Sequence, residues 1–410
     1  MRTLAKSRKK LSGLVALAAA GALALTACAG DGAGGGSGSG GTATDEPTTA
    51  ATDDAGGDDN SGDLSGLTVG VAMPTQTSER WIADGDAVKT GLEAAGMTVD
   101  LQFANDDIPT QTQQIDQMIT NGVDVLVIAS IDGTALASQL ESAGAAGIPV
   151  ISYDRLIRDS EYVDFYVSFD NYLVGVAQGT ALLHGLGLVD RDGNPAADAP
   201  EGPLNIELFA GSPDDNNAGF FFGGAIDTLQ PFIDDGTLVV KSGQTDFGKV
   251  ATLRWSQEAA QKRMEDLITS TYAGGSEPLA GVLSPFDGIS RGIITALQGA
   301  GYGPDQAAGL PVVTGQDAEI ASVKLIADGV QSSTIFKDTR TLAAQTVEVV
   351  KAMAAGQEPE ANNTEDYDNG VKVVPSYLLP VVTVFADDIQ EQLIDSGYYT
   401  ADEVAAGVSN

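Results

Sequence analysis

The sequence predicts an α/β fold of the doubly wound type, with more βα units than a single sheet holds comfortably. From residue 67 onward, short β-rich runs alternate with amphipathic stretches of helical period. Runs such as VDVLVIAS, residues 123–130, are apolar throughout, as parallel strands covered on both faces are. The helical stretches end in glycines suited to left-handed caps, namely Gly96, Gly122, Gly147 and Gly301.

Each expected strand is a short run rich in Val, Ile, Leu or Phe, and each expected helix repeats apolar residues every three or four positions. In chain order, strands are expected at 67–73, 97–103, 123–130, 148–154, 164–170, 203–211, 237–243, 279–285 and 310–317. Helices are expected at 82–96, 109–122, 133–147, 174–187, 218–233, 255 to about 272, and 288–301.

Length and charge limit the classes of protein that fit. A chain of 410 residues accommodates two ordinary domains. Lys and Arg number 21 against 57 Asp and Glu, a formal net charge of −36. So acidic a protein repels nucleic acid and anionic lipid headgroups, so no nucleic-acid partner is expected.

The N-terminus has the anatomy of a secretory signal. A basic start, MRTLAKSRKK, precedes an apolar run that ends in LTAC at Cys28, the only cysteine. The ending resembles a bacterial lipobox, which predicts a signal peptide over 1–27 and a lipid on Cys28. The alternative is a plain transmembrane anchor, for which the run is short. Residues 28–65, rich in Gly, Ser, Thr and Asp, are expected to be a flexible linker.

Polar residues follow nearly every expected strand. In doubly wound sheets ligands bind beyond the carboxyl ends of the strands, so these side chains are candidates for a common site. Asp and Asn also cap helices, which is the structural alternative for each acid taken singly. Arg and Lys cannot serve as such caps. The residues are Arg80, Trp81, Ser130 to Asp132, Asp154, Arg155, residues 212–217, Asp287, Gln316, Asp317 and Lys337.

Long ordered motifs resemble the monosaccharide-binding receptors of bacterial ABC importers. They include ERWIADG, ISYDRLIRDSEYVDFYVSFDN, AGSPDDNNA, TGQDAE, STIFKDT and VKVVPSYLL. The resemblance extends from residue 67 to about 400 and is strongest to the multiple-sugar-binding (ChvE-type) group, with xylose- and galactose-binding proteins as relatives. It implies a type I periplasmic-binding fold, in which two Rossmann-like lobes joined by three crossover segments close on a sugar.

Carried onto this chain, the resemblance places the N-terminal lobe at 66–153 plus 317–375 and the C-terminal lobe at 154–316 plus 376–410. The crossings would then lie near Tyr153, near Gln316 and within VVPSYLLP. The implied protein is a monomer anchored to the outer face of the cell membrane only through Cys28. It needs no cofactor or metal and delivers its sugar to an ABC transporter permease.

The family's ligand-binding positions map onto eleven residues of this sequence. They are Arg80, Trp81, Asp132, Asp154, Arg155, Asp215, Asn217, Trp255, Asp287, Asp317 and Lys337. The two indoles would cover the faces of a pyranose, while carboxylates and guanidinium groups bind its hydroxyls. Arg80 and Arg155 would also neutralise the acids of the cleft. Phe286 stands where galactose- and xylose-binding relatives tend to have Asn, so the preferred sugar is left open.

Other functions and sites compete with this interpretation. The same cleft could belong to an extracellular carbohydrate-active enzyme, although acids held by arginines make poor general acids. A receptor whose closed form docks on a membrane sensor or chemoreceptor is an alternative that the sequence does not exclude. Residues 190–201 have calcium-loop spacing, but Pro195 replaces the turn glycine, so an acidic surface insertion is favoured. His184 is expected to be structural, the GFFFGG segment at 219–224 to be core, and Arg254 to be a surface residue.

Overall fold

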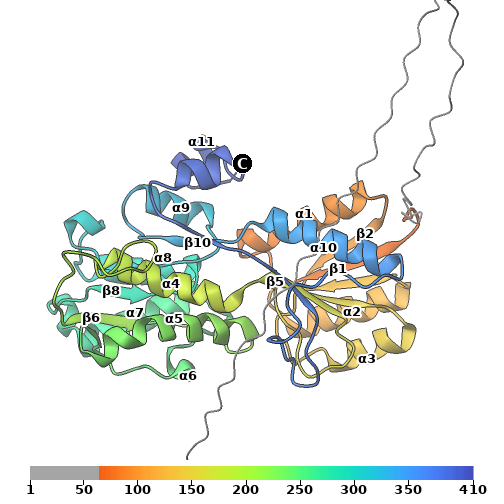
Figure 1. Ribbon diagram of the computed structural model, residues 1–410, viewed down its shortest axis with the longest axis horizontal. Coiled ribbons are helices and arrows are strands. Elements are labelled where there is room, and N and C mark those ends of the chain that lie inside the picture. Colours follow the sequence, from red (N-terminus) through yellow and green to blue (C-terminus); the bar gives the residue numbers. More distant parts are fainter. Residues whose placement is uncertain (1–63, 410) are drawn as a thin grey trace, which may run out of the picture. The chain divides into compact units, whose positions relative to one another are not determined.

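The computed structural model describes residues 64–409 (Figure 1). The predicted signal peptide, Cys28 and nearly all of the predicted linker lie outside these residues. Strands and helices alternate as the sequence predicts, and the α/β fold of the type I periplasmic-binding kind is confirmed. Within residues 64–409, no helix combines the length and apolar character needed to cross a membrane.

The first sheet has six strands in the order β11-β5-β4-β3-β1-β2, all paired in parallel. Its strands are β1 (Thr68–Met73), β2 (Thr98–Phe103), β3 (Val125–Ile128), β4 (Val150–Tyr153), β5 (Phe165–Phe169) and β11 (Ser376–Leu379). Its helices are α1 (Glu79–Ala94), α2 (Ile108–Asn121), α3 (Ala137–Ala146) and α10 (Thr339–Ala354). Figure 1 shows α1 and α10 on one face of this sheet and α2 and α3 on the other.

This arrangement explains why β3 is apolar throughout. Val125 and Val127 pack in the core beneath α1 and α10, whereas Leu126 and Ile128 pack in the core beneath α2 and α3. Successive side chains of a strand point to opposite faces, so a strand covered on both sides has no polar face.

The second sheet has four parallel strands in the order β7-β6-β8-β9. They are β6 (Leu204–Leu208), β7 (Leu238–Val240), β8 (Gly281–Leu283) and β9 (Val312–Val313). The accompanying helices are α4 (Asn171–Gly185), α5 (Asn216–Asp234), α6 (Phe247–Val250), α7 (Gln257–Thr271) and α8 (Asp287–Gly299), with a short turn η1 (Leu253–Trp255). Further along, β10 (Thr334–Phe336) pairs antiparallel with β12 (Val382–Val384), and α9 (Ile320–Ala327) and α11 (Ala401–Ala406) pack beside them. A wide turn, η4 (Gln390–Asp395), and the short turns η2 (Ala273–Gly275) and η3 (Gln306–Ala308) complete the elements.

The predicted lobe boundaries need correction. β5 pairs with β4 and β11 pairs with β5, so 154–170 and 376–379 belong to the first sheet rather than to the second lobe. Residues 317–337 pack instead with β12 and α11. The first lobe therefore comprises 64–170 and 338–379, and the second lobe comprises 171–337 and 380–409. The prediction failed because a restarted βα pattern at 164 does not show which sheet its strand joins.

Candidate functional site

A cavity of about 400 Å³ is lined by side chains from both lobes. Residues that follow the carboxyl ends of β1, β4, β6, β8, β9 and β10 all reach it, as the sequence predicts for a doubly wound fold. Nine of the eleven predicted residues line this cavity, namely Arg80, Trp81, Asp154, Arg155, Asp215, Asn217, Trp255, Asp317 and Lys337. Its volume falls within the range of small-molecule sites in proteins.

Arg80 joins the acids of the two lobes. It lies in the first turn of α1, which begins three residues earlier than expected, and it is almost fully buried. Its guanidinium binds Asp84 through Nε at 3.0 Å, Asp154 through Nη2, and Asp317 of the second lobe through Nη1 at 3.4 Å. Lys337 Nζ lies 2.9 Å from the same Asp317 oxygen. Buried charges of opposite sign thus offset one another before a ligand arrives.

The acids of this network differ in protonation behaviour. Burial by itself would raise the pKa of Asp154, but Arg80, Lys337 and Arg155 hold it below its ordinary value. Asp84, behind Arg80, is buried more completely and lies near Asp154, and its pKa rises to about 6. Burial also raises the pKa of Asp215. Of these three acids, Asp154 is therefore the one whose ionised form, a hydrogen-bond acceptor, its surroundings favour.

Trp81 lies beside two charged neighbours. The guanidinium carbons of Arg80 and Arg155 lie 4.8 and 4.9 Å from its ring centroid, within cation–π range. Arg155 Nε in turn lies 3.1 Å from Asp215 in the second lobe. The indole is only 5% exposed and belongs to the core of the first lobe. Arg80, which precedes this tryptophan in the sequence, therefore contacts the indole ring as well as the acids that it pairs with.

Trp255 lines the cavity from the second lobe. Its ring lies so close to Gly211 that a Cβ there would be 2.0 Å from it, which explains the glycine. The ring meets Phe221 and Phe286 edge-on, at centroid distances of 6.3 and 6.0 Å. Its indole nitrogen is buried and has no acceptor among the residues described. An N–H in that position is available to a ligand.

Several positive-φ residues without the freedom of glycine lie at the cavity. Asp154, Arg254, Trp255 and Asp317 have φ of 58°, 57°, 55° and 87°. Such conformations cost free energy and are kept where surrounding contacts fix them, often at functional sites. The two carboxylates are therefore held by their backbone as well as by their ion pairs, and Trp255 is held by its backbone and its contacts with Phe221 and Phe286.

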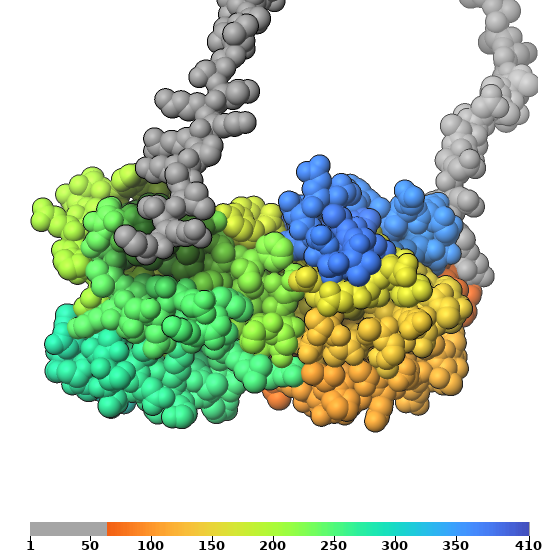
Figure 2. All heavy atoms as spheres, turned by 90° about the horizontal axis from the view of Figure 1, so that it is seen from below, coloured from red at the N-terminus to blue at the C-terminus, as the bar shows by residue number. Residues whose placement is uncertain are grey.

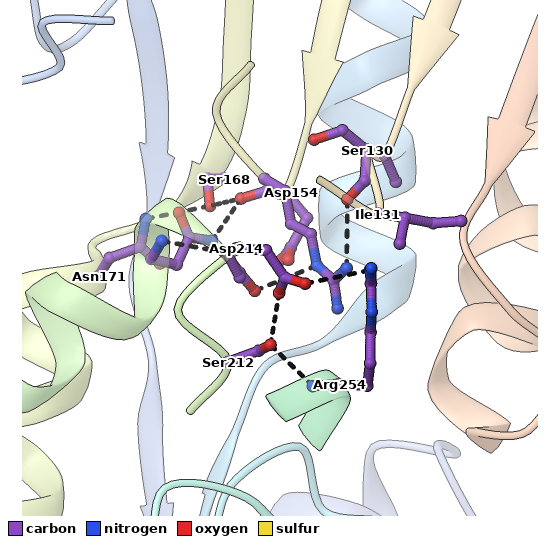
Figure 3. A network of polar contacts seen from close by, with 12 residues as sticks. Ser130, Ile131, Asp154, Ser168, Asn171, Ser212, Asp214 and Arg254 are labelled. Carbon is purple, nitrogen blue, oxygen red and sulfur yellow. Dashed lines mark hydrogen bonds and ion pairs between the residues drawn. The ribbon is translucent and has the colours of Figure 1, made fainter. Parts of the chain in front are cut away.

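The sequence-based expectation that Arg254 is a surface residue was wrong, because Arg254 lines the cavity. Its Nη1 lies 3.1 Å from Asp214, and its backbone N–H donates to Ser212 Oγ at 2.8 Å. Ser212 Oγ also donates to Asp214, so the three residues form the closed network of Figure 3. Phe221 and Phe286 also line the cavity, although neither was predicted to do so.

Asp132 and Asp287 do not line the cavity, contrary to the prediction. Asp132 stabilises a turn by accepting from the backbone N–H of Thr134 at 2.8 Å. Asp287 is fully buried at the start of α8 and accepts from Glu319 N at 2.9 Å and Gln331 Nε2 at 2.8 Å. Burial, with Glu319 nearby, raises its pKa to about 8. Its role is structural, and neither Arg80 nor Arg155 neutralises it.

The remaining candidates have local structural roles. His184 Nδ1 lies 3.1 Å from the carbonyl of Val189, and its ring packs edge-on against Phe385. In the 190–201 segment, Asp190 accepts from the backbone N–H groups of Asp192 and Asn194. Residues 64–409 contain no group of three or more His, Cys, Asp or Glu side chains placed to hold a metal. Of the three successive phenylalanines in GFFFGG, one packs against Tyr367, one lines the cavity and one packs against Phe247.

Comparison with known proteins places this geometry in a family. The model of the periplasmic binding protein domain matches residues 69–358. The multiple sugar-binding periplasmic receptor ChvE of Rhizobium radiobacter is 53% identical over 82% of this chain and 92% of its own length. The D-xylose-binding periplasmic protein of Escherichia coli is 36% identical over 82% of this chain and 92% of its own length.

Solved structures of sugar-binding proteins are also similar to this chain. An ABC transporter solute-binding protein from Clostridium phytofermentans, solved with bound β-D-glucose, is 49% identical with a TM-score of 0.76, covering 82% of this chain and 99% of its own. A carbohydrate transporter solute-binding protein from Chloroflexus aurantiacus, in complex with D-glucose, is 38% identical with a TM-score of 0.71, covering 82% and 98%. The chain therefore belongs to the periplasmic binding protein family, among the extracytoplasmic sugar-binding receptors of the ChvE type.

Proposed function

We propose that this protein captures a monosaccharide, an aldohexose or aldopentose such as glucose, galactose, xylose or arabinose, and delivers it to an ABC transporter permease. The observation that carries the proposal is that both tryptophans of the chain, one from each lobe, line one cavity together with ionised groups from both lobes. The relatives' names and their bound sugars support the same class of ligand.

The chemistry of the cavity suits a neutral sugar ring. A pyranose has apolar C–H faces that pack on aromatic rings and a rim of hydroxyls that need donors and acceptors. Asp154 and Asp317 accept hydrogen bonds, while Arg80, Arg155 and Lys337 donate them. Because these charges already pair with one another, the cavity presents oriented hydrogen-bonding groups with little reorganisation.

Energetics require that the lobes close around the sugar. Charge-assisted hydrogen bonds contribute about 1.5–3 kcal/mol each, so ten of them would total roughly 15–30 kcal/mol, more than the binding energy of a small sugar. Desolvation of the acids and closure of the lobes offset most of that sum. The remainder shifts the population toward the closed conformation, which the permease would recognise.

The proposal includes no catalysis and places the protein at the outer face of the cell membrane. The pKa of Asp154 is held low, which suits an acceptor and not a general acid. The sequence of the N-terminus supports lipidation of Cys28, so that a monomer tethered to the outer face of the cell membrane would supply the permease.

A calorimetric panel tests the function. The full chain is titrated with D-glucose, D-galactose, D-xylose, L-arabinose and, as a control of different class, an amino acid. We expect one sugar per chain, with the sugars unchanged on recovery. Absence of binding for all four sugars would contradict the proposal, and turnover of a glycoside would replace it by an enzymatic function.

A further inference from the structure

We propose that Arg158, a residue outside the sugar cavity, is a latch that holds the two lobes in the closed conformation. By that role it would set the affinity for every sugar by the same factor. The inference rests on the proposed sugar-binding function and adds to it a positioning residue that touches no ligand. Neither Arg158 nor its partner Asn216 lines the cavity.

The side chain of Arg158 is fixed within the first lobe. It lies in the loop between β4 and β5, where its backbone N–H donates to the carbonyl of Gly133 at 2.8 Å. Its Nε donates to the carbonyl of Asn369 at 3.1 Å. Asn369 is fully buried, and its Nδ2 donates to the carbonyl of Ser160 at 2.7 Å. The guanidinium is therefore oriented by its own lobe before it reaches the other one.

From that anchor, Arg158 reaches the second lobe. Its Nη1 donates to Oδ1 of Asn216, the first residue of α5. The residues on either side of Asn216, Asp215 and Asn217, both line the cavity. Arg158 thus binds the N-terminus of α5, the same segment that brings polar groups to the sugar. The contact between Arg158 and Asn216 therefore favours the contacts of this segment with the sugar, and the reverse holds as well.

Other contacts follow the same junction between the lobes. The rings of Phe220 in α5 and Tyr367 in the first lobe lie 5.3 Å apart. The backbone N–H of Gly133 donates to the carbonyl of Asp214 at 3.3 Å. Figure 2 shows the yellow segment of the first lobe against the green segment of the second along this boundary. Arg158 supplies the charge-assisted hydrogen bond among these contacts.

A latch has a kinetic and thermodynamic signature that a pocket residue lacks. The apparent affinity of a ligand that binds the closed form scales with the fraction of protein able to close. Loss of the latch lowers that fraction whichever sugar is present, so all affinities fall together. Dissociation accelerates because the closed complex opens more readily.

The test is a double-mutant cycle in the full chain, with Arg158→Ala, Asn216→Ala and both together, titrated with D-glucose and D-xylose. We expect each single variant to weaken both sugars by about tenfold, through faster dissociation, and the double variant to add little more. Lys351→Ala, which removes a cation paired with Glu348 in its own helix, is the matched control and should bind as the wild type does.

A purely structural role predicts the opposite pattern. If Arg158 only anchors the loop around Asn369, Arg158→Ala lowers the thermal stability of the sugar-free protein and Asn216→Ala leaves affinity unchanged. That result overturns the latch, as does a change in the ratio of glucose to xylose affinity.

A sugar-free readout separates failure of the latch from failure of the proposed function. Spin labels are introduced at Glu93→Cys in α1 and Lys262→Cys in α7, in a chain with Cys28→Ser. Arg158→Ala should lower the population of the closed-lobe separation in this distance distribution. An unchanged distribution overturns the latch, while a wild type that ignores all sugars in calorimetry overturns only the proposed function.

Discussion

Asp154 and Asp287 occupy matching places in the two lobes but have different roles. Each follows a strand of its parallel sheet, each is buried, and each was expected to bind the sugar. Asp154 points toward Arg80 at the cavity and its pKa is held low, whereas Asp287 accepts from Glu319 N beneath the cavity and its pKa is about 8. Of these two acids, the one at the cavity is paired with cations, which favour its ionised form, whereas burial near Glu319 favours the protonated form of the other.

Replacing Asp154 should have the largest effect on binding. Asp154→Asn removes the charge that accepts from the sugar and leaves Arg80 short of a partner in a buried site, so affinity should fall by about 3 kcal/mol. Calorimetry on wild type and variant measures this. Arg80 keeps Asp84 and Asp317 as partners, so the melting temperature of the sugar-free protein should change little. Retained affinity with a large loss of stability would mean that Asp154, like Asp287, has a structural role.

Replacing either tryptophan should weaken sugar binding, but the two replacements should differ in how much they lower the stability of the fold. Trp255→Ala and Trp81→Ala should each weaken sugar binding by about 2 kcal/mol. Trp81 lies in the hydrophobic core of the first lobe, so its removal should also lower the free energy of unfolding by about 3 kcal/mol, whereas half-buried Trp255 should cost less. Urea denaturation of both variants, beside calorimetry, distinguishes them. Equal stability losses would contradict the difference.

Asp287→Asn should leave sugar affinity unchanged and alter the pH dependence of stability. The folded protein keeps a proton on Asp287 up to about pH 8, while the unfolded chain releases it near the ordinary pKa of 3.8. This group therefore makes wild-type stability fall as pH rises between those values. The Asn variant lacks that dependence, so it should gain stability relative to wild type between about pH 5 and about pH 8.

Denaturant titrations at the two pH values give this comparison. Asp84, with a pKa of about 6, titrates in both proteins and therefore cancels from the difference. A stability difference that stays constant with pH would show that Asp287 is ionised throughout the range.

Arg254→Ala should have the smallest effect. Its guanidinium is about one-third exposed, and ion pairs of that kind contribute about 0.2–1 kcal/mol. Sugar affinity should fall by no more than that amount in calorimetry. The control is Lys262→Ala, which removes an exposed ion pair with Asp266 in α7. A loss as large as that of Asp154→Asn would mean that Arg254 binds the sugar directly.

The sequence predicts where polar groups gather but not which way each one points. Parallel strands end at a common edge, and for that reason Asp154, Asp317 and Lys337 could be assigned to one cavity. The side chain of Asp287 turns away from the cavity because the backbone N–H of Glu319 donates to it there. That N–H is brought near Asp287 only by tertiary packing.

Two further features could not be read from local patterns. Phe221 lines the cavity while its neighbours in GFFFGG do not, because the rotation of α5 about its axis decides which ring faces the sugar. β5 joins the first sheet because it pairs with β4, although its position in the chain fits either lobe. Both depend on contacts between segments far apart in the sequence.

Intrinsic fluorescence offers the most direct test of the central claim, that a monosaccharide binds between Trp81 and Trp255. These are the only tryptophans in the chain, and both line the cavity, so the indole signal reports on that cavity alone. Titration of the full chain with D-glucose should change this emission saturably, with one sugar bound per chain. Emission that stays constant with glucose, galactose, xylose and arabinose alike would contradict the account.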